Sequence, residues 1–183
     1  MITASAKKRE NIAEYLLYMW QIEDLIRAYG LDIDRIDREL LSKYEGLDAS
    51  KRKEMYGWYE SLIDMMRREG VEKSGHLQIN RNTLADIEDL HRRLLADPKH
   101  AAYANQYYAT LPLIVELRAK AGDNRKGEIE TLFEAMYGLL LMRLQHKEVS
   151  DDTLKATAQI SKFLALLASY YKKDYEDPEA LWK

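Results

Sequence analysis

The sequence predicts an all-α protein that folds as a single-domain bundle of about six to seven helices. Apolar residues recur at steps of three and four along most of the 183-residue chain, the spacing of one helix face. The three prolines and eight glycines mostly fall where such patterns stop. No stretch alternates apolar and polar residues as a half-buried strand does. The longest expected helices would measure about 30–37 Å, close to the diameter of a compact domain of this size, so a bundle is favoured.

The first helix is expected over Ser5–Tyr29, ending at Gly30. Its middle part, Leu16–Trp20, is apolar on every side. A helix of that kind is usually covered by neighbours on most sides, so we expect this helix at the centre of the bundle. A short helix is expected next, over about 34–44.

Two cap residues predict the following helices. Asp48 is a typical N-cap and predicts a helix over 49–69 that ends at Gly70. Asn82 predicts the start of the next helix in the same way. Between them, Val71–Arg81 has no helical period and is the longest irregular segment expected. Loops of that length are often functional, but the apolar residues of this one also suit a segment pinned across the bundle.

The next predicted helix has one proline at its start and another inside it. Asp97 and Pro98 read as an N-cap followed by proline in the first turn, and the helix is expected to run to about Lys120. Pro112 lies inside it. Because proline removes a backbone donor and crowds the preceding turn, a kink is predicted near Ala109.

The last two helices are expected over 128–146 and 151–172, the second capped by Ser150. Residues 173–183 are expected to form a loosely ordered tail, so the predicted domain covers residues 1–172. Two glycines, Gly57 and Gly138, lie inside predicted helices, where each costs about 1 kcal/mol relative to alanine. Close approach of a neighbouring helix or room for a bulky ring is the expected reason, and contact with a ligand is the alternative.

Composition excludes several classes of protein. The chain has 28 basic and 31 acidic residues and a net charge of −3, so it has no positive excess to concentrate on nucleic acid. It has no cysteine, which excludes disulfides, thiolate metal sites and cysteine nucleophiles. Neither a signal peptide nor a membrane span is predicted, because charged residues flank the short apolar run near the N-terminus. A cytoplasmic protein is expected.

No catalytic or metal-binding motif is complete. Glu88 and His91 form Glu-x-x-His on a predicted helix, but di-iron bundles need that motif twice, together with two further glutamates. His91 is therefore expected to be a hydrogen-bonded residue at the edge of the core. The segment Gly122–Gly127 has the glycine spacing of a phosphate loop but lacks the Lys-Ser/Thr and the preceding strand. We expect no metal, no cofactor and no catalytic centre.

Two arginines stand on apolar stripes, Arg118 and Arg143. A buried guanidinium needs a carboxylate, an anion or water. Both arginines lie in the last turns of their helices, where the helix dipole favours positive charge and the long stem reaches solvent, with Glu14 or Asp24 as possible internal partners. The alternative is an anion-binding pocket that Arg118 and Arg143 form together with His76 of the 71–81 segment.

Several strings of residues are similar to a known family. They are Ala13–Asp24, Trp58–Gly70, Gly75–Asn80, Leu111–Arg118 and Tyr137–Leu141. Together they resemble DUF4924, a family of uncharacterised Bacteroidetes proteins, along nearly the whole chain. The resemblance implies a bacterial, cytoplasmic, helical protein, and it implies no particular activity.

Two functions are therefore weighed. The favoured one is a helical-bundle binding or interaction protein without catalytic activity, whose partner is a second copy of itself or another protein. The alternative is a bundle or enzyme that binds a small anionic molecule at Arg118, Arg143 and the 71–81 segment. A DNA-binding regulator would need a basic recognition helix, and no predicted helix is basic enough.

Overall fold

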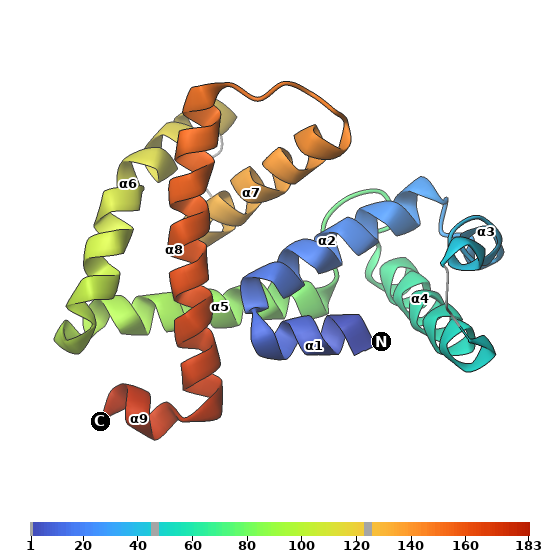
Figure 1. Ribbon diagram of the computed structural model, residues 1–183, viewed down its shortest axis with the longest axis horizontal. Helices are drawn as coiled ribbons and strands as arrows, with labels where there is room; N and C mark the ends of the chain where they lie inside the picture. The colour runs from blue at the N-terminus through green and yellow to red at the C-terminus, as the bar shows by residue number, and fades with distance from the viewer. Residues whose placement is uncertain (1, 45–47, 123–125) are drawn as a thin grey trace. The chain divides into compact units, whose positions relative to one another are not determined.

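The computed structural model describes residues 2–44, 48–122 and 126–183, and all regular secondary structure in these ranges is helical, as predicted (Figure 1). Where the sequence predicted one domain over 1–172, the internal contacts group into two compact units. The first unit comprises Met1–Lys8 and Glu14–Asn82, and the second comprises Arg9–Ala13 and Thr83–Lys183. Each unit is described by itself.

The N-terminal helix is divided in two, where one continuous helix over 5–29 was expected. Helix α1 covers Ile2–Glu10 and α2 covers Ile12–Ala28. The break falls at Asn11, whose Oδ1 accepts a hydrogen bond from the backbone N–H of Ala13 at 3.1 Å. Asparagine in this role satisfies a donor that the start of a helix leaves free, so it favours a new helix start over continuation. In the apolar middle of α2, Leu16, Met19 and Trp20 are buried, whereas Leu17 and Tyr18 are partly exposed.

Of the next two helices, α4 begins at its predicted cap residue. Helix α3 (Ile33–Glu39) is capped by Asp32 and followed by the short 3₁₀ helix η1 (Leu41–Lys43). Helix α4 spans Ala49–Glu69, and the Asp48 side chain accepts from the backbone N–H of Lys51 at 2.8 Å. Gly70 ends α4 in the left-handed conformation, at φ +68°.

Helix α5 (Gln78–Ala96) starts before the predicted cap at Asn82, which shortens the irregular segment to residues 71–77. The reason is a side chain from the preceding helix. Oε2 of Glu69 accepts a hydrogen bond from the backbone N–H of Gln78 at 2.6 Å and so satisfies a donor in the first turn.

The second unit is built on α6 (Ala101–Ala121), α7 (Glu128–Leu144) and α8 (Asp151–Glu176), with η2 (Pro98–His100) before them and α9 (Pro178–Trp182) after them. Ser150 caps α8, as predicted, by accepting from the backbone N–H of Thr153. The three long helices contact one another pairwise (Figure 1). Their buried side chains include Ile114, Leu132, Phe133, Ile160, Phe163 and Leu167.

Two expectations about this unit concern the path of α6 and the order of the C-terminal residues. Helix α6 runs without interruption through Pro112, and the kink near Ala109 stays a prediction. The expected loose tail over 173–183 is helical up to Glu176 and again in α9. Asp177 caps α9 by accepting from the backbone N–H of Ala180 at 3.0 Å, so this local signal outweighs the high polarity of the segment. None of the helices in the described ranges combines the length and apolar character needed to cross a bilayer.

Candidate functional site

The three residues expected to form an anion pocket are distributed over both units. His76 belongs to the first unit, whereas Arg118 and Arg143 belong to the second, so neither unit by itself holds all three.

Arg118 lies near the end of α6 and turns toward the start of α7. One guanidinium nitrogen donates to the backbone oxygen of Lys126, and Nη1 lies 4.0 Å from Oε1 of Glu128. Its Nε is buried without a hydrogen-bond partner. A nearby carboxylate discourages a second anion, so these contacts favour an internal partner. That partner is Glu128. Of the two partners expected from the sequence, Glu14 forms an ion pair with Lys7, and Asp24 forms one with Arg27.

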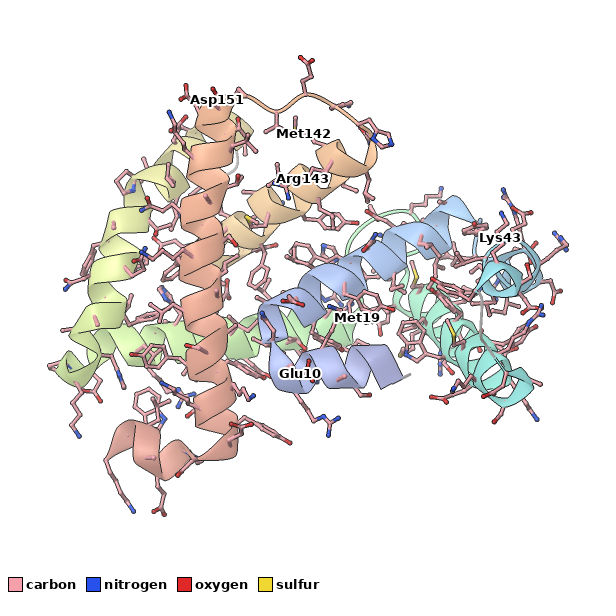
Figure 2. All side chains as sticks on the ribbon, in the orientation of Figure 1. Glu10, Met19, Lys43, Met142, Arg143 and Asp151 are labelled. Carbon is pink, nitrogen blue, oxygen red and sulfur yellow. The ribbon has the colours of Figure 1, made fainter. Side chains whose placement is uncertain are left out.

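Arg143 stands on the last turn of α7, next to Met142 (Figure 2). It is exposed to solvent. This is the arrangement expected of an arginine that serves the negative end of the helix dipole, rather than one that closes a pocket.

His76 takes part in a buried polar cluster that the sequence patterns did not reveal. Its Nδ1 lies 2.6 Å from Oε2 of Glu23, and its ring stacks on the Trp20 indole with centroids 4.3 Å apart. Glu23 is completely buried, and its Oε1 also accepts from the backbone N–H of Leu77 at 2.9 Å and from the Asn80 amide at 2.6 Å. One carboxylate thus holds the end of the 71–77 segment and the start of α5 against α2. The signal available in the sequence was the position of Glu23 three residues after Trp20, on the same helical face.

Arg27, one turn further along α2, holds the other end of this segment. Its Nη2 donates to the backbone oxygens of Val71, at 3.0 Å, and of Gly75, at 2.5 Å. Because α2 satisfies polar groups at both ends of the segment, the segment is pinned. This arrangement matches the alternative in which residues 71–81 are a segment fixed by packing, and not a functional loop.

The Glu-x-x-His residues serve packing and helix capping. His91 Nδ1 lies 2.6 Å from the Tyr103 hydroxyl, and burial lowers the pKa of the His91 imidazole to about 4. The Glu88 carboxylate lies at the start of α7, beside Gly127, where burial and the charge of Glu130 raise its pKa. Within residues 2–44, 48–122 and 126–183, no group of three or more metal-ligating side chains is arranged to hold a metal ion.

A groove of about 800 Å³ opens between α6, α7 and α8 in the second unit. Its size falls within the range of ligand and helix-binding grooves. The walls combine apolar and small side chains with polar and charged ones. The apolar and small residues include Leu113, Leu117, Ala135, Gly138, Ala156 and Ile160, and the charged residues are Glu116, Lys120, Asp152 and Lys155.

The two helical glycines do not have the expected cause. A Cβ atom placed on Gly57 or on Gly138 would meet nothing within 4 Å, so neither glycine makes room for a neighbouring helix or ring of the chain. The expectation of close packing is wrong at both positions. Gly138 lines the groove, so the empty space beside it is part of that groove.

An uncharged, exposed helix face borders the groove. Residues 101–115 of α6 include no Asp, Glu, Lys or Arg, in a chain that is 32% charged. Tyr108 and Val115 are each 61% exposed on this face, and Pro112 is exposed between them. The charged residues that line the groove form two pairs of opposite charge, Glu116 with Lys120 at 2.6 Å and Asp152 with Lys155 at 3.9 Å. The surface is therefore apolar and close to neutral, which is typical of the centre of a protein interface.

Comparison with known proteins identifies a family and no individual relative. A family model described as a domain of unknown function, DUF4924, matches residues 1–178 and agrees with the resemblance seen in the sequence. No curated protein and no solved structure matches the chain.

Proposed function

We propose that this chain, which belongs to the DUF4924 family, is a binding protein that associates with a second copy of itself through the groove of the second unit and the adjoining face of α6. The observation that carries the proposal is the open, partly apolar groove of about 800 Å³ beside a charge-free exposed helix face. Soluble chains seldom leave such a surface uncovered unless it binds something.

Charge favours a second copy as the occupant. In a two-fold interface the same patch meets itself, so any charge at its centre faces an equal charge. The α6 face avoids this repulsion because residues 101–115 are uncharged. The ion pair of Glu116 with Lys120 keeps the rim neutral as well.

Shape supports the same occupant. Tyr108 and Val115 project from α6 beside a hollow lined by Ala135 and Gly138. Large side chains next to a hollow of small residues are self-complementary, since the projections of one copy can enter the hollow of the other. Pro112 belongs to both the exposed face and the groove wall, so the two surfaces are continuous.

The test is the mass of the protein in solution as a function of concentration, measured by light scattering or sedimentation. The wild type is expected to shift from monomer to dimer. Tyr108→Glu places a charge at the centre of the interface and should raise the dissociation constant about tenfold or more. Tyr175→Glu is the matched control, because Tyr175 is 77% exposed and lies outside the groove.

A wild-type mass that stays monomeric up to about 1 mM would contradict the proposal. So would equal effects of Tyr108→Glu and Tyr175→Glu, because the dimer would then use another surface. A monomer that binds apolar dyes at Gly138 would instead indicate a small-molecule site. The cytoplasmic location and bacterial origin inferred from the sequence stay predictions.

A further inference from the structure

The C-terminal helix α9 is docked through a tryptophan on the end of α8. The indole N–H of Trp182 donates to Oδ1 of Asp174 at 2.5 Å. Nζ of Lys99 donates to the backbone oxygen of Lys183 at 2.6 Å. Figure 1 shows α9 turning back from the end of α8 toward the corner between α5 and α6. A short segment is thus held at its aromatic side chain and at its main chain.

Arg93, near the end of α5, completes the recognition of the indole. Its guanidinium carbon lies 4.8 Å from the centroid of the Trp182 ring, and its Nη2 donates to the other oxygen of Asp174 at 2.6 Å. Cation–π contact and a shared carboxylate make the arrangement specific for an aromatic ring with an N–H donor. Burial opposes the charge of Asp174, but hydrogen bonds from Arg93 and Trp182 outweigh it and lower the pKa of the carboxyl group.

His100 forms the floor of this site and is left with an unused polar atom. Its ring makes edge-to-face contacts with both Trp182 and Tyr170, with centroids 5.3 Å apart in each case. His100 is only 7% exposed, yet its Nε2 is buried without a hydrogen-bond partner. Leaving such an atom unpaired costs free energy. The C-terminal segment therefore fills the site without giving Nε2 of His100 a hydrogen-bond partner.

We propose that Arg93, His100, Tyr170 and Asp174 form a reversible recognition site for a tryptophan-bearing peptide segment, and that residues 177–183 occupy it as a tethered competitor. The ligand class follows from the contacts: an indole to lie under Arg93, an N–H for Asp174, and a main-chain oxygen for Lys99. A partner segment that also supplies a hydrogen bond to Nε2 of His100 would bind more tightly than the chain's own. The C-terminal segment then controls access to the site.

The test uses the full chain labelled with 5-fluorotryptophan and followed by ¹⁹F NMR. Three resonances are expected, because tryptophan occurs three times, and Trp182→Phe assigns the one of interest. Arg93→Ala is expected to move the Trp182 resonance to the position of an exposed ring. Arg92→Ala is the matched control, since the neighbouring Arg92 side chain is 70% exposed and pairs with Asp89.

Competition decides whether the site is reversible. An unlabelled peptide with the sequence of residues 177–183 should move the Trp182 resonance of the wild type toward the exposed position. Because a short tether gives an effective concentration in the millimolar range, half displacement is expected at about 1–10 mM peptide. The same peptide with alanine in place of tryptophan should require at least about ten times more.

Two results would overturn the proposal: a Trp182 resonance that no peptide moves, or equal displacement by both peptides. The first would show α9 to be a fixed part of the fold. Because the competition uses the wild-type chain, it gives an answer even if Arg93→Ala fails to fold.

Discussion

The Glu23 cluster of the first unit is a set of buried polar groups that bind one another, whereas the groove of the second unit is a space that the chain leaves open. At Glu23, one buried carboxylate accepts from Leu77 and Asn80 and contacts His76, so α2, the 71–77 segment and the first turn of α5 have one favoured arrangement. In the groove, partly apolar walls face about 800 Å³ that the chain leaves unfilled.

The difference separates residues that define the fold from residues available for binding. A satisfied buried charge tolerates little change, because removing one partner leaves others unpaired in a site that excludes water. Substitutions in an unfilled groove should change the free energy of unfolding little, and some of them should raise it. The two regions should therefore respond to mutation with different size and sign.

The largest expected effect is at Glu23. Glu23→Ala removes the acceptor of the Leu77 N–H and of the Asn80 amide, and should lower the free energy of unfolding by about 4 kcal/mol. Tryptophan fluorescence during urea unfolding is a suitable measurement, because Trp20 and Trp58 both lie in this unit. Glu14→Ala, on the same helix, removes an exposed ion pair with Lys7 and should change the value by less than about 0.5 kcal/mol. Equal losses would contradict the account.

The second effect depends on pH and concerns His91. Burial holds the pKa of this imidazole at about 4, against 6.5 when it is free, so between these values the unfolded chain binds a proton that the folded chain does not. The free energy of unfolding should therefore fall as pH falls from 6.5 to 4, with His91 responsible for about 3 kcal/mol. Urea unfolding at both pH values measures it. His91→Phe should be less sensitive to pH by that amount; an unchanged pH dependence would refute the assignment.

The smallest effect compares two glycines of the second unit. Gly138→Ala should stabilise the protein by about 1 kcal/mol, because alanine favours the helix and its Cβ meets nothing within 4 Å. Gly127→Ala should destabilise it by a similar amount, since its Cβ would lie 2.1 Å from Oε1 of Glu88 and displace that carboxylate. Thermal unfolding of both variants gives the comparison. Destabilisation by Gly138→Ala would show that the space beside Gly138 is not open.

Local signals in the sequence were sufficient for most helix boundaries. Asp48 and Ser150 begin helices, and Gly30 and Gly70 follow their ends, because capping depends on residues within one turn. The break at Asn11 was missed because no glycine or proline marks it in the sequence. The early start of α5 was missed because its cap, Glu69, belongs to another helix.

The candidate sites were less predictable, since they depend on contacts between distant residues. Glu23 and Leu77 are 54 positions apart, and no local pattern joins them. Arg118 was recognised as a residue in need of a partner, but the choice of Glu128 depends on how α6 meets α7. The sequence around Gly138 does not indicate whether a neighbouring helix packs against this glycine or an open groove lies beside it.

The bond between Glu23 and Leu77 also has a consequence during protein synthesis. The ribosome adds about 5–20 residues per second, so Glu23 exists for roughly 3–11 seconds before the backbone group that it binds has been made. For that time α2 carries an unmatched carboxylate among apolar side chains that have nothing to cover them. Transiently exposed apolar surface favours aggregation, so slower translation of residues 24–77 should lengthen the period of risk.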